Sequence, residues 1–400
     1  MTKLKFTLRG LHEGQWEVFL DPSRFKVVAA GRRWGKSFLG LAMCIARAWE
    51  GGQVWWISPN YPIGQIAWRG LLSLVKSLPG VTVKIGDLMV TFPTGGWIQF
   101  KSADSKDGLR GEGLDLVILD EAAFIKKGVW SKVVAPALID HKGSAAFLST
   151  PFGLNWFHDL TIKAPDLDDW TYWHKTTFDN PLLDPAEIEG WRQTMTERDF
   201  QEEVLAAFNE EGGSVFRYIK DAATATLQNG PAEGRRYVMG VDLARHVDFT
   251  TIVVMDGTTR AVACIDRFNE IDWKVQVGRV TALADRFDVA AILIDETGVG
   301  GPVVEELRRA TNRAIYGITF NNANKLDLVQ SLALAFEQHT ITIPDDEVFV
   351  GEHMAYQCER LPSGLLRYGA PEGLHDDYVT GMMLAHHGLQ FTESHKVTWS

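Results

Sequence analysis

The sequence of 400 residues is short of cysteine, has no long apolar run and has no excess of positive charge. Its cysteines, Cys44, Cys264 and Cys358, lie far apart without a CxxC pair, which excludes a disulfide framework or a thiolate zinc site and indicates a reducing compartment. No hydrophobic run approaches the ~20 residues that a membrane helix needs, and charges interrupt the first residues where a signal peptide would be apolar. We therefore expect no membrane segment.

What is present is the composition of an ordinary folded protein, with 46% hydrophobic and 23% charged residues. The length predicts two domains. The net charge of −11 argues against a protein that coats nucleic acid through bulk charge, although the first third of the chain is net basic. Lysines of that third are candidates for phosphate contacts, with solvated loop lysines as the alternative; they are Lys101, Lys106, Lys126 and Lys127.

The first half alternates short apolar runs with helical stretches, which predicts an α/β fold with a parallel sheet. The buried strands are expected at residues 25–29, 54–57, 116–119 and 145–148. Turn signals separate residues 81–85, 88–92 and 97–100, which predicts an antiparallel meander added to the sheet.

A second pattern follows an acidic helical stretch and the sequence EEGGS at 210–214. Three consecutive strands are expected at 237–241, 250–255 and 261–268, and a fourth at 290–294 after a helix. We therefore predict a first domain over residues 1–210, a linker over 211–232 and a second domain over 233–400.

The segment from Ala29 to Ser37, AAGRRWGKS, follows an apolar strand and precedes an amphipathic helix. This is the setting of a phosphate-binding loop, in which Gly35 and the helix N-terminus hold phosphates, Lys36 reaches the β and γ oxygens, and the Ser37 hydroxyl binds Mg²⁺. The pattern GxxxxGK[ST] places its first glycine where this chain has Ala30. A helix cap without a ligand is therefore the alternative for the loop taken alone.

A second motif favours nucleotide hydrolysis over that alternative. Residues 116–121, LVILDE, form an apolar strand that ends in two carboxylates, and the ends of parallel strands share the edge that carries the loop. Asp120 is expected to hold Mg²⁺ through water, and Glu121 to orient or deprotonate the attacking water.

Weaker candidates surround this pair. The hydroxyls of Ser149 and Thr150 end the next strand and could sense the γ-phosphate, with a strand-terminating turn as the alternative. The amide of Gln15 could contact the adenine edge. The cation that stabilises phosphoryl transfer is expected among Arg32, Arg33 and Arg110, from the same subunit or a neighbouring one.

In the second half, Asp242 and Asp295 each close a predicted strand, and Asp376 and Asp377 open the final helix. Carboxylates that converge are unfavourable unless divalent cations neutralise them. This arrangement predicts phosphodiester hydrolysis with two Mg²⁺ or Mn²⁺ ions.

Asp376 lies in line with the inward apolar stripe of the helix and ranks first as a ligand, and Asp377 is an outer ligand or a group that supports one. The nearby acids Asp248 and Glu296 suit turn or cap roles. The nearby histidines, His246 and His375, are candidates for substrate or metal contacts, with a structural role as the alternative.

With these motifs in this order, the sequence resembles the large terminase subunits of tailed bacteriophages, the ATP-driven motors and nucleases that package viral DNA. The resemblance spans nearly the whole chain. It rests on GRRWGKS with its displaced glycine, LRG before LVILDEAA, STPFG, GVDLA, LIDETGVGG and HDD.

The resemblance implies an additional-strand, RecA-like P-loop ATPase domain followed by an RNase H-like, RuvC-type nuclease domain. It assigns Lys36, Ser37, Asp120 and Glu121 to ATP hydrolysis, Ser149-Thr150 to coupling and Gln15 to adenine. It assigns Asp242, Asp295 and Asp376 to metals, and Arg110 is our choice for a cation acting on a neighbouring subunit.

The resemblance also implies partners and cofactors. They are ATP with Mg²⁺, two Mg²⁺ or Mn²⁺ ions at the nuclease site, double-stranded DNA, the small terminase subunit, the portal protein of the procapsid, and further copies of the chain in a ring on the portal, with a monomer as the free form. The expected location is the host cytoplasm. Two other functions stay open: a helicase-like ATPase with a repair or recombination nuclease, and a non-catalytic assembly adaptor.

Overall fold

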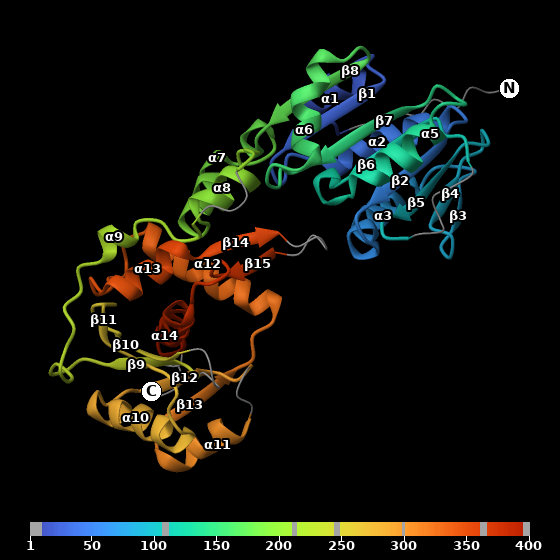
Figure 1. The fold of residues 1–400 in the computed structure, drawn as a ribbon. Coiled ribbons are helices and arrows are strands. Elements are labelled where there is room, and N and C mark those ends of the chain that lie inside the picture. The colour runs from blue at the N-terminus through green and yellow to red at the C-terminus, as the bar shows by residue number, and fades with distance from the viewer. Residues whose placement is uncertain are drawn as a thin grey trace. The chain divides into compact units, whose positions relative to one another are not determined.

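The structure is a computed structural model that describes residues 10–105, 112–209, 214–243, 249–297, 301–360 and 366–394. The chain forms two compact units, Met1–Glu210 and Glu211–Ser400, whose elements are labelled in Figure 1. None of the helices among the described residues is both long enough and apolar enough to cross a membrane.

The first unit is built on an eight-stranded sheet with the order β3-β4-β5-β2-β6-β7-β1-β8. The strands from β5 to β8 in that order run parallel, and β3, β4 and β5 form the antiparallel meander that the turn signals predict. The strands are β1 (Phe25–Ala30), β2 (Gln53–Ser58), β3 (Thr82–Lys84), β4 (Met89–Thr91), β5 (Trp97–Ser102), β6 (Leu116–Asp120), β7 (Ser144–Ser149) and β8 (Trp170–Lys175).

Helices cover both faces of this sheet because successive residues of its buried strands point to opposite sides. Val28 and Trp56 face one core, whereas Val27 and Trp55 face the other. Both tryptophans thus fill core space. The helices are α1 (Glu13–Leu20), α2 (Lys36–Trp49), α3 (Tyr61–Val75), α4 (Lys127–Val129), α5 (Ala135–Ala137), α6 (Trp156–Lys163), α7 (Pro185–Gly190) and α8 (Glu197–Glu203).

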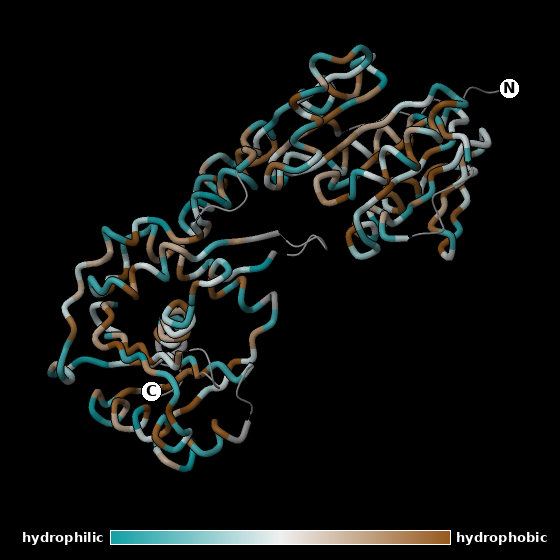
Figure 2. Tube along the Cα trace, viewed as in Figure 1, coloured by the Kyte–Doolittle hydropathy of each residue, from teal (hydrophilic) through white to brown (hydrophobic). Residues whose placement is uncertain are grey.

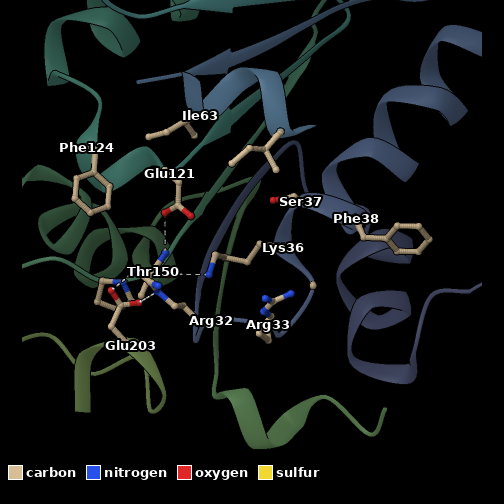
Figure 3. Close-up of a pocket in the computed structure, with 13 residues that line it drawn as sticks. Arg32, Arg33, Lys36, Ser37, Phe38, Ile63, Glu121, Phe124, Thr150 and Glu203 are labelled. Atoms are coloured by element: carbon tan, nitrogen blue, oxygen red, sulfur yellow. Dashed lines mark hydrogen bonds and ion pairs between the residues drawn. The ribbon is translucent and has the colours of Figure 1, made fainter. Parts of the chain in front are cut away.

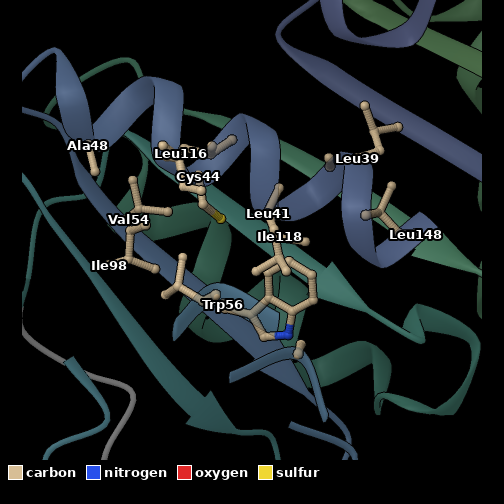
Figure 4. Close-up of a cluster of buried hydrophobic side chains, with 14 of the residues drawn as sticks. Leu39, Leu41, Cys44, Ala48, Val54, Trp56, Ile98, Leu116, Ile118 and Leu148 are labelled. Carbon is tan, nitrogen blue, oxygen red and sulfur yellow. The ribbon is translucent and has the colours of Figure 1, made fainter. Parts of the chain in front are cut away.

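The core between α2 and the sheet fixes the loop that precedes α2. Leu41 and Cys44 lie on the inner face of the helix and pack against strand residues such as Trp56 (Figure 4). Gly40 lets the helix approach closely, because a Cβ there would lie 2.8 Å from Trp56 and Leu148 side-chain atoms. The first turn of α2 is therefore held firmly at the carboxyl edge of the sheet.

The second unit contains a five-stranded sheet with the order β11-β10-β9-β12-β13. The three consecutive strands that the sequence predicts pair antiparallel, and β12 and β13 run parallel to β9. The strands are β9 (Tyr237–Asp242), β10 (Thr250–Asp256), β11 (Val262–Phe268), β12 (Ala291–Asp295) and β13 (Ala314–Ile318), with a separate hairpin of β14 (Gln357–Arg360) and β15 (Leu366–Gly369).

Helices also cover both faces of this sheet, and the hydropathy trace of Figure 2 alternates between hydrophobic and hydrophilic stretches within each unit. The helices are α9 (Ile219–Ala222), α10 (Trp273–Arg286), α11 (Gly301–Ala310), α12 (Asn322–Glu337), α13 (Glu347–Ala355) and α14 (Asp377–Ser394). α14 lies against β9 because both sides lack side chains at the contact: a Cβ on Gly240 would lie 2.1 Å from the Gly381 carbonyl oxygen.

The segment expected to be a linker, residues 211–232, is in part a piece of the second unit. Phe216, Ile219 and Ala222 are buried in the core that also contains α12, α13 and α14. The Val215 N–H donates to the Tyr356 carbonyl at 3.0 Å. The sequence suggested a linker because glycine and acidic residues precede this segment, whereas its apolar residues are few and are buried only by tertiary packing.

Candidate functional site

The phosphate loop lies between the end of β1 and the start of α2. Arg33 and Gly35 have positive φ angles of 63° and 106°, which curl the backbone tightly. Gly31 has no space for a side chain, because a Cβ there would lie 2.4 Å from the Val204 carbonyl oxygen and 2.5 Å from Thr177 Oγ1. The displaced glycine of the motif is therefore required by packing against a distant part of the chain.

That part, residues 175–204, braces the loop through its backbone. The Gly31 N–H donates to the Lys175 carbonyl at 3.0 Å, and the Arg32 N–H donates to the Glu203 carbonyl at 2.6 Å. Two side chains complete the contact: Thr177 Oγ1 donates to the Arg32 carbonyl and Asn180 Nδ2 to the Arg33 carbonyl, each at 2.7 Å. The loop is thus held between its own strand and the segment that follows β8.

Lys36 begins α2 and is buried, with 7% of its surface exposed. Its Nζ donates to the carbonyls of Ala30 at 2.7 Å and Gly31 at 3.1 Å, and to Thr150 Oγ1 at 2.8 Å. Burial lowers the pKa of this amine, while the neighbouring carboxylates Glu121 and Asp120 act in the opposite direction. The ammonium group is therefore linked both to the loop and to the end of β7.

Asp120 ends β6 and is 3% exposed. Burial, and then the charge of Glu121, raises its pKa to about 8. One carboxylate oxygen, Oδ1, has no hydrogen-bond partner among the described residues. An unpartnered buried carboxylate oxygen of this kind fits an electropositive ligand, such as a water molecule of a hydrated Mg²⁺ ion.

Glu121 follows directly with a φ of 51°, a left-handed conformation that costs a residue with a side chain of order 1 kcal/mol or more. Its Oε2 lies 3.3 Å from Ser149 Oγ and accepts from the Thr150 N–H at 3.4 Å. The predicted coupling residues thus contact the predicted catalytic carboxylate, and Thr150 contacts Lys36 as well (Figure 3).

Arg32 and Glu203 form a two-point ion pair across the loop, with Arg32 Nε to Glu203 Oε2 at 2.5 Å and Nη2 to Oε1 at 3.0 Å. The bond to Glu203 raises the pKa of Arg32. Arg33 is exposed and lines the same pocket. Arg110 lies outside the described residues.

One pocket with a volume of about 490 Å³ is lined by the charged and polar side chains of Arg32, Arg33, Lys36, Glu121, Thr150 and Glu203. Ser37 contributes to its wall beside Lys36, and Phe38, Ile63, Ile66 and Phe124 supply apolar surface. Ser37 and Asp120 are the hydroxyl and carboxylate that would hold Mg²⁺ here, and the unpartnered Asp120 oxygen fits that assignment.

Gln15 does not line this pocket. It is 2% exposed, its Oε1 accepts from the His12 N–H at 3.0 Å, and its Nε2 donates to the Gly35 carbonyl at 2.9 Å. Its amide is therefore used at both ends to start α1 and to hold the loop. These two bonds leave the amide a second N–H and a second lone pair, so the contact with the adenine edge stays a prediction.

The second candidate site lies at one end of the sheet of the second unit. Side chains of a strand alternate between its two faces, and the even-numbered Val238 and Gly240 of β9 face α14. Asp242 at the end of β9 therefore faces the same way. In β12, Ala291 and Leu293 face α14, so Asp295 does too.

β9 and β12 are neighbours, with Val241 opposite Ile294, so the two carboxylates end adjacent strands on one face. Burial, and then the charges of Asp295, Asp377 and Asp376 in that order, raises the pKa of Asp242 well above its usual range. The charge of Lys325 on α12 acts in the opposite direction and lowers this pKa. The predicted acids thus share a strongly negative sheet edge.

The final helix starts later in the structure than the sequence suggested. α14 begins at Asp377, and Asp376 precedes it, with its carbonyl accepting from the Thr380 N–H at 3.0 Å. Asp377 is the more buried of the pair and lies 3.5 Å from Arg267 Nη2 and 3.6 Å from His375 Nδ1. His375 thus contacts a predicted metal-binding residue.

Among the described residues, no three His, Cys, Asp or Glu side chains form a closed metal site. The sequence led us to expect convergence on one point. Among the described residues, the acids share an edge and act on the same carboxylate of Asp242, but they do not close on one point. Their donor set of carboxylate oxygens fits Mg²⁺ or Mn²⁺.

The remaining residues that the sequence singled out lie in different surroundings. Glu296 packs against Gly317, in keeping with a structural role, and Lys101 lies over the Trp55 ring at 5.2 Å. Lys126 and Lys127 are exposed. Outside the described residues lie Lys106, His246 and Asp248.

Two family profiles match the chain and divide it between them. The profile described as "Terminase large subunit, T4likevirus-type, N-terminal" matches residues 27–220. The profile described as "Terminase RNaseH-like domain" matches residues 239–388. The chain belongs to the terminase large-subunit family.

Relatives that align with this chain are also large terminase subunits. The large terminase subunit of Thermus phage G20c is 27% identical over 437 aligned positions, which cover 96% of this chain and 89% of that protein. That of Escherichia phage T5 is 31% identical over 204 positions, which cover 49% and 47%. A solved large terminase from a thermophilic bacteriophage matches with a TM-score of 0.60 at 14% identity, over 94% of this chain and 98% of that one, which supports the fold.

Sequence reasoning missed three residues of this large terminase: Glu203 beside the loop, and Arg267 and Glu352 beside the acids. Glu203 stands in an acidic helix, where nothing in the local pattern distinguishes it from solvated neighbours. Arg267 and Glu352 lie on β11 and α13, far from each other and from Asp377 in sequence. Only a charged residue in an otherwise apolar run could have drawn attention to Glu352.

Proposed function

We propose that this chain is the packaging motor and nuclease of a tailed phage. The first domain, residues 1–210, hydrolyses ATP to move double-stranded DNA into the procapsid, and the second, residues 233–400, cuts concatemeric DNA with divalent cations. The observation that carries the proposal is the presence, on one chain, of a phosphate loop beside a strand-end Asp-Glu pair and of four carboxylates at one edge of a second sheet.

In the motor site, the triphosphate would lie along the pocket beside Lys36 and the N-terminus of α2. Ser37 and Asp120 would hold Mg²⁺, which neutralises charge on the phosphates. Glu121 would orient the attacking water, and its contacts with Ser149 and Thr150 would pass the change at the γ-phosphate to the end of β7. Arg32 and Arg33 would contact phosphates, and Arg110 would act on a neighbouring subunit.

In the nuclease site, Asp242, Asp295 and Asp376 would hold divalent cations, supported by Asp377. The cations supply a nucleophile from bound water and stabilise the leaving oxygen. The raised pKa of Asp242 supports this role, because a buried cluster of like charges is stable only when a cation compensates it.

We further propose that the chain acts in the cytoplasm of the infected host, with double-stranded DNA, the small terminase subunit and the portal protein as partners. On the portal it would form a ring of copies. The exposed Lys126 and Lys127 support contacts with DNA phosphates.

The test is a reciprocal pair of variants in the full chain, assayed for ATP turnover and for cleavage of plasmid DNA with Mg²⁺ or Mn²⁺. Glu121→Gln should lower ATP turnover by about 10²–10⁴-fold, the usual contribution of a catalytic base, and leave cleavage intact. Asp295→Ala should do the reverse. ATP turnover that survives Glu121→Gln would remove that residue from its role, and a wild-type chain with neither activity would favour the adaptor function.

A further inference from the structure

The N-terminus of α14 is capped by a different helix. The first N–H groups of a helix lack partners within it, and an aspartate just before the helix usually accepts from one of them. Asp376 occupies that position, yet the Tyr378 N–H donates at 2.7 Å to Glu352 Oε2 of α13. Among the described residues, none donates a hydrogen bond to the Asp376 carboxylate, which leaves it available for another ligand.

Arg267 of β11 joins Glu352 to Asp377. Its Nη2 lies 3.1 Å from Glu352 Oε1 and 3.5 Å from Asp377 Oδ2. The guanidinium carbon lies 3.7 Å from the centre of the Phe249 ring, so the group is held flat. The side chains of all three charged residues are less than one-fifth exposed, which makes the arrangement a largely buried one in which each charge needs a partner.

The charges around the site explain why both Glu352 and Arg267 are needed. Asp242, Asp295, Asp376 and Asp377 carry four negative charges when ionised, which two divalent cations would balance. Glu352, when ionised, adds a fifth negative charge beside them. Arg267 offsets that charge, and it fixes Glu352 and Asp377 relative to each other. Thr251 Oγ1, which donates to the Asp377 carbonyl at 2.7 Å, anchors the same turn to the sheet.

We propose that Glu352 and Arg267 are positioning residues of the nuclease site. Glu352 caps α14 in place of Asp376 and so leaves the Asp376 carboxylate to a divalent cation, and Arg267 holds Glu352 and Asp377 in place. This inference rests on the proposed nuclease function.

The experiment measures Mn²⁺ binding to the full chain by isothermal titration calorimetry, beside DNA cleavage as a function of Mn²⁺ concentration. Glu352→Ala should weaken Mn²⁺ binding about 10–100-fold, the usual effect of losing a residue that orients metal ligands. Cleavage should recover largely at saturating Mn²⁺. Glu352→Gln, whose amide oxygen can still accept from Tyr378, should keep most of the affinity.

The variant Arg267→Met distinguishes a positioning role of Arg267 from a role that depends only on its positive charge. If Arg267 only contributed a positive charge, its loss would tighten Mn²⁺ binding, whereas the positioning role predicts weaker binding. The matched control is Arg279→Met, because Arg279 pairs with Asp266, the neighbour of Arg267 on β11, away from the acids. This control should bind Mn²⁺ like the wild type.

The melting curve and hydrogen exchange of β9 peptides report whether the second unit of each variant is folded. Folded Glu352→Ala that binds Mn²⁺ like the wild type, or folded Arg267→Met that binds it more tightly, would overturn the inference. Asp242→Asn that binds Mn²⁺ like the wild type would instead overturn the nuclease site itself, so the two failures are distinguishable.

Discussion

The two candidate sites of this chain treat their charged groups in opposite ways. In the first unit, two cationic side chains are already bonded within the protein: Lys36 bonds to two loop carbonyls and Thr150, and Arg32 bonds to Glu203. In the second unit, carboxylates accumulate at one edge, and Asp242 is buried among like charges. A ligand at the first site must replace existing bonds, whereas a cation at the second supplies a charge that is missing.

The largest effect that would sharpen this comparison is expected from Asp242→Asn. Cleavage of DNA should fall by about 10³-fold, since metal assistance contributes several kcal/mol to such reactions. The same variant should stabilise the metal-free second unit, because it removes a buried carboxylate that its neighbours repel. Nuclease assays and hydrogen exchange of β9 peptides measure the two effects. A variant that loses both activity and stability would contradict the comparison.

Ligands should stabilise the two units selectively. Mn²⁺ at about 100 times its dissociation constant should add about 2.7 kcal/mol to the second unit, without nucleotide, and EDTA should remove the gain. The first unit should respond to nucleotide with Mg²⁺. Hydrogen exchange of β9 and β6 peptides separates the units, and Asp295→Ala is the control that should abolish the Mn²⁺ effect. Equal stabilisation of both units by Mn²⁺ alone would show that the sites do not differ in this way.

A third prediction concerns a buried group that has fewer partners than Lys36. His353 is fully buried, its Nδ1 lies 2.8 Å from the Phe349 carbonyl oxygen, and its Nε2 has no partner among the described residues. Burial lowers its pKa to about 4. Below the ordinary histidine pKa the unfolded chain binds a proton that the folded chain does not, so this group costs stability as the pH falls.

His353→Phe should remove that cost. Between pH 6.5 and 4, the unfolding free energy of the wild type relative to the variant should fall by about 1.4 kcal/mol per pH unit. Comparing two proteins cancels the opposite contributions of carboxylates with raised pKa, such as Asp242. Hydrogen exchange of α14 peptides at several pH values gives the slope, and parallel curves for the two proteins would count against the assignment.

The smallest effect is expected at the nucleotide pocket of the first unit, where Arg32 and Glu203 form an ion pair. Glu203→Gln should tighten nucleotide binding by up to about fivefold, because an ion pair on this partly exposed surface contributes at most about 1 kcal/mol and no longer has to be broken. Glu189→Gln is the control, since Glu189 forms an exposed pair with Arg192 on α7. Weaker binding by Glu203→Gln, measured by calorimetry, would show that Glu203 assists the nucleotide.

Much of the fold could be predicted because its signals are local. The apolar runs of β1, β2, β6 and β7 are continuous, as buried parallel strands require, and each ends at a polar motif. Placing Lys36, Glu121 and Thr150 together needed only the rule that parallel strands share a carboxyl edge. Asp242 and Asp295 followed from the same rule.

The rest could not be predicted because it depends on contacts without a pattern. The bracing of the loop by Thr177 and Asn180 uses single polar side chains far along the chain. Phe216 and Ile219 looked like parts of a linker, because three or four apolar residues have no periodicity until a core surrounds them. The hydrogen bond from Gln15 to the Gly35 carbonyl depends on where α1 packs.

Gly31 has a practical consequence for recognising such motors among unclassified viral genomes. Because Gly31 has no Cβ, Thr177 and Val204 can pack directly against it. The loop glycine and the segment after β8 therefore form one structural unit, although most strands of the sheet lie between them in the sequence. A sequence search could therefore allow the loop glycine to shift by one place, provided that a strand followed by a polar turn occurs later in the chain, as β8 and Thr177 do here. Such a search should retain divergent family members that a fixed loop spacing discards.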